Sequence, residues 1–122
     1  MDDSNASLSG MSKRDICLLY LKKYAEKDLE SVESLFADDI VLRDWKIRVE
    51  GKAEAMRETR KNFESAESIE IDVLSTYESE DTVAAELKIT VNSTEELYVV
   101  DVMTVNEEGR ISAIRAYLGR GD

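Results

Sequence analysis

The first half of the chain repeats its hydrophobic residues at the spacing of an α-helix. Ser12 with Asp15 approximates a capping box, so we expect a helix that begins near Ser12. Its apolar stripe consists of Ile16, Leu19, Tyr20 and Tyr24. Asp28 is a typical N-cap residue and predicts a second, short helix that ends near Ala37. A third helix is expected after Gly51, where it covers the domain from outside.

From residue 69 onward, hydrophobic and polar residues alternate with a period of two, which predicts strands. The expected strands cover residues 69–73, 83–91, 97–105 and 111–118, with turns at 78–81 and 106–109. An earlier strand at residues 40–45 places Asp44 on the same face as Ile40 and Leu42. Three helices followed by consecutive antiparallel strands predict an α+β domain, with its helices packed on a curved antiparallel sheet.

The length of 122 residues fits a single domain. Residues 1–11 are polar and have no period, so we expect a disordered leader there and the domain at residues 12–122. The longest apolar run, at residues 16–21, is far shorter than the roughly 18 residues that a membrane span needs. The acidic start, with Asp2 and Asp3, lacks the features of a secretion signal, so we expect a cytoplasmic protein.

Composition removes several kinds of chemistry. The chain has no histidine and one cysteine, Cys17, which excludes histidine-dependent triads, histidine metal sites and cysteine-based zinc sites. Proton chemistry must therefore use carboxylates, tyrosine or lysine, and we expect neither a metal nor a cofactor. The net charge of -11 repels phosphate and anionic lipid, so we expect neither nucleic acid nor a membrane as a partner.

Asp101 lies inside an otherwise apolar strand, on the same face as Val99 and Met103. Desolvation raises the pKa of such a carboxyl above its reference value of about 3.9 unless a cation pairs with it. A neutral Asp101 is a hydrogen-bond donor. The alternative is a structural aspartate that is held by the backbone or by an arginine such as Arg115.

Tyr20 and Asp44 also lie on inward faces, and a curved sheet closed by helices brings such faces to one cavity. An ionised carboxylate can accept a proton from carbon while a neutral acid and a phenol donate hydrogen bonds to the resulting enolate oxygen. Alone, Tyr20 is typical of a core aromatic and Asp44 of a strand-end cap. Together with Asp101 they predict a site for proton transfer.

The spacing of Tyr20, Asp44 and Asp101 resembles the ketosteroid isomerase branch of the nuclear-transport-factor-two-like (NTF2-like) superfamily, also called SnoaL-like. The resemblance extends to Asp28-Leu29, residues 35–39, Asn106, Gly109, Arg115-Ala116 and Gly119. It implies a cone-shaped α+β barrel of the cystatin-like kind. It also implies that Asp44 is the general base, and that Tyr20 and a protonated Asp101 form the oxyanion hole.

By this resemblance we expect an isomerase that moves a proton next to the carbonyl of a flat, apolar small molecule, for example a steroid. Its expected substrate pocket contains Phe36, Trp45, Val99, Met103 and Leu118. Two alternatives stay open because the superfamily reuses one cavity for many functions. They are a small-molecule-binding dimer without catalysis, and a SnoaL-like cyclase or hydrolase with a different substrate.

Two features depart from the isomerase pattern. Arg60 stands where some members have a supporting tyrosine, and its cation could pair with Asp101 and keep that carboxyl ionised. Residues 45–50 replace a proline and a longer loop, so the mouth of the pocket differs. The superfamily also implies a homodimer through the outer face of the sheet, where Ile69, Ile71, Val83 or Ile89 would serve if they face away from the core.

Overall fold

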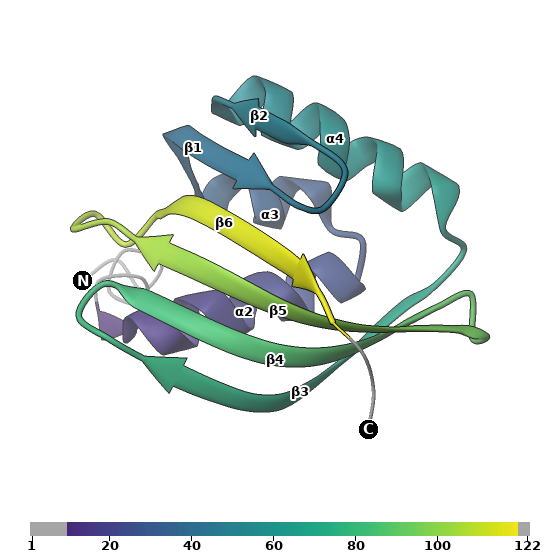
Figure 1. Cartoon of the computed structure of the whole chain (residues 1–122). Helices are drawn as coiled ribbons and strands as arrows, with labels where there is room; N and C mark the ends of the chain where they lie inside the picture. The colour runs from purple at the N-terminus through teal and green to yellow at the C-terminus, as the bar shows by residue number, and fades with distance from the viewer. Residues whose placement is uncertain (1–9, 120–122) are drawn as a thin grey trace.

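The structure, a computed structural model, describes residues 10–119 and arranges three helices and six strands in that part of the chain (Figure 1). The elements are α2 (Lys13–Ala25), α3 (Leu29–Leu35), β1 (Phe36–Arg43), β2 (Arg48–Glu50), α4 (Lys52–Ser65), β3 (Ile69–Glu78), β4 (Thr82–Val91), β5 (Glu95–Val105) and β6 (Ile111–Leu118). The predicted α+β class is confirmed. Of the expected leader, residues 1–9 lie outside the described residues, and Met11 packs against the core.

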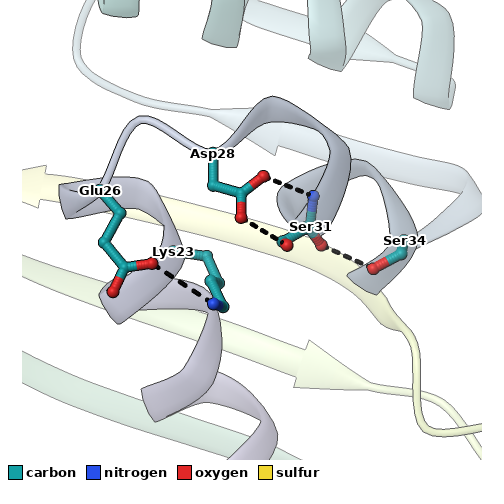
Figure 2. A network of polar contacts seen from close by, with 5 residues as sticks. All are labelled: Lys23, Glu26, Asp28, Ser31 and Ser34. Atoms are coloured by element: carbon teal, nitrogen blue, oxygen red, sulfur yellow. Dashed lines mark hydrogen bonds and ion pairs between the residues drawn. The ribbon is translucent and has the colours of Figure 1, made fainter. Parts of the chain in front are cut away.

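The helices begin at the predicted residues. The Ser12 hydroxyl accepts a hydrogen bond of 3.0 Å from the backbone N–H of Asp15 and caps α2. Asp28 caps α3, because its carboxylate accepts from the backbone N–H of Ser31 at 3.2 Å and from the Ser31 hydroxyl at 2.7 Å (Figure 2). Gly51 precedes α4 with φ of 90°, a conformation that glycine adopts without a steric penalty. Local sequence chemistry therefore sets all three starts.

The six strands form one sheet in the order β2-β1-β6-β5-β4-β3. All neighbouring pairs are antiparallel except β1 and β6, which run parallel, so the sheet is mixed and not wholly antiparallel as expected. The second helix ends at Leu35 instead of Ala37, because Phe36 and Ala37 are buried in extended backbone at the start of β1. The short strand β2 was not predicted from the sequence.

The hydrophobic core lies between the helices and the inner face of the sheet (Figure 1). Val83 and Ile69, which were candidates for an outer dimer face if they faced away from the core, are buried in this core. Ile71 and Ile89 are half-buried and pack against the same core. The strand register turns these four side chains toward the helices, so the condition for their use at an outer dimer face is not met.

The outer face of the sheet carries the residues that alternate with the buried ones. In β5 these are Tyr98, Val100 and Val102, all of which are half-buried. Val100 pairs with Tyr117 of β6, whose side chain is exposed. Within residues 10–119, no helix is both long enough and apolar enough to cross a membrane.

Candidate functional site

A cavity of about 310 Å³ opens between α2, α4, the turn after β1 and the inner face of the sheet. Its volume lies at the lower end of the range of roughly 300–1,000 Å³ that is typical of ligand pockets. Aliphatic side chains of the sheet form one wall, namely Ile69, Ile71, Ile89, Val91, Leu97, Val99 and Ile114. Polar side chains come from α2, α4, β5 and the turn: Tyr20, Tyr24, Asp44, Lys46, Glu58, Thr59, Asn62, Ser65 and Asp101.

Asp44 follows the last residue of β1 and reaches the cavity from a tight turn. Its Oδ1 accepts hydrogen bonds from the backbone N–H groups of Lys46 at 2.7 Å and Ile47 at 2.9 Å. The Asp44 N–H donates to the Ile47 carbonyl at 3.0 Å and closes the turn. These two backbone donors hold the carboxyl group of Asp44 in place. Among the described residues, no side chain or backbone group bonds to Oδ2, which stays available to a ligand.

Asp101 enters the cavity from the middle of β5, with only 8% of the residue exposed. Its register partners, Ala85 and Ala116, offer no polar group from their side chains. Burial first, and the charge of Asp44 second, raise the pKa of Asp101 from 3.8 to about 7. Asp101 therefore holds a proton near neutral pH far more often than an ordinary aspartate does.

No cation in the described part of the chain forms an ion pair with Asp101. Arg60 is exposed on α4 and does not line the cavity, so the expected possibility that it keeps Asp101 ionised is wrong. Arg115 is exposed as well, and its register partner is the outward-facing Val102. The alternative of an arginine-held structural aspartate therefore fails for both residues.

Tyr20 lies on the inward face of α2, where 5% of the residue is exposed. Its ring packs against Phe36, with 5.7 Å between the ring centroids. Burial, followed by the neighbouring Tyr24 and Asp101, raises the pKa of Tyr20 well above its usual value. The hydroxyl thus keeps its proton at neutral pH and can donate a hydrogen bond into the cavity.

The five expected pocket residues divide into two groups. Trp45 and Val99 line the cavity. Phe36 and Met103 are completely buried in the core and do not line the cavity. Phe36 packs against the ring of Tyr20, and Met103 follows Asp101 by two residues on the same face of β5. Leu118 is 48% exposed at the last position of β6 and does not line the cavity. Ala116 of the same strand lines the cavity instead.

Sequence reasoning missed the polar side chains that α2 and α4 add to the cavity. Tyr24 follows Tyr20 by four residues, which places both on one helix face, yet it was assigned only to the apolar stripe. Glu58, Asn62 and Ser65 recur at the spacing of one face of α4. This periodicity was the available signal, but the helix was expected to cover the domain from outside.

The arrangement combines a carboxyl group held by backbone N–H groups with a buried phenol and a buried carboxyl group of raised pKa, in a largely apolar cavity. Within residues 10–119, no three cysteine, aspartate or glutamate side chains gather as metal ligands would. Cys17 is buried outside the cavity lining, and burial raises the pKa of its thiol to about 12. The polar groups of the cavity suit chemistry in which a proton moves and negative charge develops on an oxygen.

Comparison with known proteins gives a consistent result. Residues 19–114 match the family model of the SnoaL-like domain. No curated protein sequence matches the chain. Among solved structures, the chain resembles an NTF2-like protein from Cytophaga hutchinsonii, with 14% identity, a TM-score of 0.76, and 89% of this chain and 91% of that chain covered.

Two further solved structures carry functional names. A candidate ketosteroid isomerase from Kribbella flavida shares 18% identity at a TM-score of 0.77, with 90% of this chain and 79% of that chain covered. The epoxide hydrolase/cyclase-like enzyme SalBIII, which takes part in pyran ring formation in the polyether salinomycin, shares 23% identity at a TM-score of 0.77, with 88% and 90% covered. These likenesses show the NTF2-like fold of the chain.

Proposed function

The chain belongs to the SnoaL-like family, and we propose that it is an enzyme that moves a proton next to a carbonyl group of an apolar small molecule. Asp44 is the base in this proposal, and Tyr20 and protonated Asp101 are the hydrogen-bond donors. The reaction resembles that of a steroid isomerase, and steroids are one substrate class that fits. The proposed chemistry needs no cofactor.

The proposed reaction has two proton transfers. The Oδ2 atom of Asp44 takes a proton from the carbon beside the carbonyl, and the electrons of the broken C–H bond form the C=C bond of an enolate. Tyr20 and Asp101 donate hydrogen bonds to the enolate oxygen, which carries the negative charge. In a ketone with a C=C bond one carbon further from the carbonyl, this enolate is a dienolate. Asp44 then returns the proton to the far carbon of the dienolate, the C=C bond moves into conjugation, and the C=O bond forms again in the product.

The observation that carries the proposal is the contrast between two carboxyl groups in one cavity. Asp44 is held by two backbone donors, whereas Asp101 has no such partner and has a pKa of about 7. When two carboxyl groups in one site have such different surroundings, one can act as the base and the other as the acid or hydrogen-bond donor. The apolar wall of the sheet excludes water and so strengthens the donors.

Exchange of hydrogen for deuterium tests this function without knowledge of the natural substrate. A panel of cyclic ketones and enones is incubated with the protein in D₂O, and loss of the proton beside the carbonyl is followed by ¹H NMR. We expect exchange with at least one flat bicyclic or steroid ketone, and we expect Asp44→Asn to abolish it. Exchange rates equal to those of buffer across the panel would contradict the proposal.

Epoxide opening is a second candidate, because the same pair of carboxyls suits it and SalBIII shares the fold. Protonated Asp101 would give its proton to the epoxide oxygen as the C–O bond breaks. Asp44 would take the proton from the attacking hydroxyl or water. Product formation from an epoxide together with no exchange of ketone protons would favour this function over the isomerase.

A binding function without catalysis has less support. A cavity filled by side chains such as Trp45, with no room for a ligand, would have favoured it over the enzyme. Trp45 instead lines the cavity with 43% of the residue exposed, and about 310 Å³ stay open. Because a binding protein also needs an open cavity, the support for an enzyme comes from the different environments of Asp44 and Asp101.

We also propose that two copies of the chain associate through the outer face of the sheet. Val100 and Val102 are half-buried there, and Tyr117 is 56% exposed beside Val100. Tyr77 of β3 is exposed as well, and its hydroxyl bonds to Glu86 at 2.7 Å. The charged side chains of Glu86 and Arg115 flank the two valines on this face. An apolar patch with a charged rim is typical of a protein–protein interface.

A further inference from the structure

Tyr24 is a cavity residue that the proposed reaction does not use. It follows Tyr20 by four residues on α2, so the two side chains lie on one helix face and about 6 Å apart along the helix axis. Their ring centroids are 5.8 Å apart. A molecule that binds Tyr20 and Asp101 with one end can therefore bring a neighbouring part of its framework past Tyr24.

Contacts from α4 hold Tyr24 in place. Its ring meets Phe63 edge to face, with 4.8 Å between centroids. Asn62 Nδ2 donates a hydrogen bond to the Tyr24 hydroxyl oxygen at 3.1 Å. Since these neighbours fix both the ring and the oxygen of Tyr24, its hydroxyl is preorganised and does not have to be ordered by a ligand.

The Tyr24–Asn62 pair has unused hydrogen-bonding capacity. The Tyr24 oxygen accepts from Asn62, and its own proton finds no acceptor among residues 10–119. The Asn62 Oδ1 atom likewise accepts no bond from the described residues. Burial raises the pKa of Tyr24 although the bond from Asn62 opposes this, so the hydroxyl remains a donor at neutral pH. The pair thus offers one donor and one acceptor at the cavity.

The remaining surroundings indicate the kind of molecule that would use the pair. The sheet opposite α2 and α4 presents aliphatic side chains such as Ile71, Ile89 and Leu97. Asn62 is exposed, so the pair lies near the opening of the cavity, whereas Tyr20 and Asp101 lie deeper and are buried. The cavity therefore has a deep polar end, an apolar wall and a second polar group near its mouth.

We propose that Tyr24 and Asn62 form a second polar subsite that binds a hydroxyl or carbonyl oxygen of a largely apolar substrate whose first carbonyl contacts Tyr20 and Asp101. A hydroxyl uses both groups of the pair, because it accepts from Tyr24 and donates to Asn62. The inference rests on the proposed function for the position of the first oxygen. It narrows the substrate class to flat, apolar molecules with two oxygens.

Isothermal titration calorimetry with naphthols tests the subsite without any turnover. 2-Naphthol is a flat phenol with one oxygen, and the isomeric dihydroxynaphthalenes place a second oxygen at different distances from the first. We expect the best-matched diol to bind wild type roughly tenfold more tightly than 2-naphthol, as one satisfied hydrogen bond allows. In Tyr24→Phe we expect this preference to fall to less than twofold, because the second oxygen of the diol loses its hydrogen-bond donor. The ring of residue 24 stays in place in this variant.

Tyr77→Phe is the matched control, because it also removes a hydrogen-bonded tyrosine hydroxyl, but on the outer face of the sheet. It should keep the full preference. Asn62→Ala changes an exposed residue, so it serves as a second variant if Tyr24→Phe does not fold, and we expect it to reduce the preference severalfold. The inference is overturned if every diol binds wild type within twofold of 2-naphthol, if the preference survives in Tyr24→Phe, or if no member of the series binds.

The two proposals fail in different ways. A diol preference that depends on Tyr24, together with no exchange of ketone protons, would support the subsite and contradict the reaction. Proton exchange that depends on Asp44, together with equal binding of naphthol and diols, would support the reaction and overturn the subsite.

Discussion

Asp44, in the turn after β1, and Asp101, in β5, face one cavity although β6 lies between β1 and β5 in the sheet. Their carboxyl groups interact, and the charge of Asp44 contributes to the raised pKa of Asp101. The two residues differ in their partners: Asp44 is held by backbone donors of its own turn, whereas Asp101 is surrounded by apolar strand residues. This difference is the basis of the proposed division of roles.

The interaction predicts that Asp44→Asn lowers the pKa of Asp101. The shift is partial, because burial is the larger cause and remains in the variant. The Asp101 carboxyl can be titrated by ¹³C NMR in both proteins. A pKa of Asp101 that is equal in wild type and Asp44→Asn would contradict the interaction.

The raised pKa of Asp101 also predicts how stability depends on pH. Between 3.8 and about 7, Asp101 is ionised in the unfolded chain but still protonated in the folded one. The folded state then binds more protons, so this residue makes the protein less stable as pH rises through that window. Asn cannot ionise, and the free energy of unfolding of Asp101→Asn should therefore rise relative to wild type by about 4 kcal/mol across it.

Urea unfolding at several pH values between 4 and 8 measures this difference. Asp38→Asn is the control, because the Asp38 side chain is 98% exposed and lies outside the cavity, where it contacts the Lys52 ammonium. A difference between Asp101→Asn and wild type that stays constant over the whole range would show that Asp101 titrates normally.

Removal of either proposed donor should slow proton exchange, and a change at Asp101 that keeps a donor should slow it less. Tyr20→Phe and Asp101→Leu each remove a donor to the enolate oxygen, and each should lower the rate of proton exchange by about 10²- to 10³-fold. Asp101→Asn keeps an N–H donor, so we expect a loss of tenfold or less. Equal losses in the Leu and Asn variants would indicate that Asp101 does not act by donating a hydrogen bond. Tyr77→Phe should leave the rate unchanged.

The proposed dimer predicts that a charge on the outer face separates the copies. Tyr117→Glu places a carboxylate beside Val100, and burial of this charge at the interface costs free energy. Sedimentation should show a dimer for wild type and a monomer for Tyr117→Glu, whereas Ala53→Glu on the exposed side of α4 should remain a dimer. A monomeric wild type at tens of micromolar would contradict the proposal.

The sequence is most informative where a local rule acts. The caps at Ser12 and Asp28 and the strands of the second half follow from residue type and period, and the structure confirms them. Asp101 could be singled out because a carboxylate within an apolar strand is costly whatever the fold. The raised pKa of Asp101 follows from the same reasoning.

Other features depend on contacts that one strand or helix does not reveal. The parallel pairing of β1 with β6 brings residues far apart in the chain together, and no local pattern distinguishes it from an antiparallel pair. The faces of Ile71 and Ile89 depend on which side of the sheet the helices cover. Tyr24 and Asn62 meet only because α2 and α4 line the same cavity.

Ultraviolet absorbance of a 3-oxo-Δ5 steroid mixed with the protein is the most direct test of the central claim, because migration of the double bond creates a conjugated enone. We predict that the enone band grows with wild type and that Asp44→Asn slows its growth by about 10²- to 10⁴-fold, as loss of a general base does. Growth of the band at the same rate with wild type and Asp44→Asn would contradict the role of Asp44 as the base. Growth at the rate of buffer with both proteins would contradict a steroid substrate.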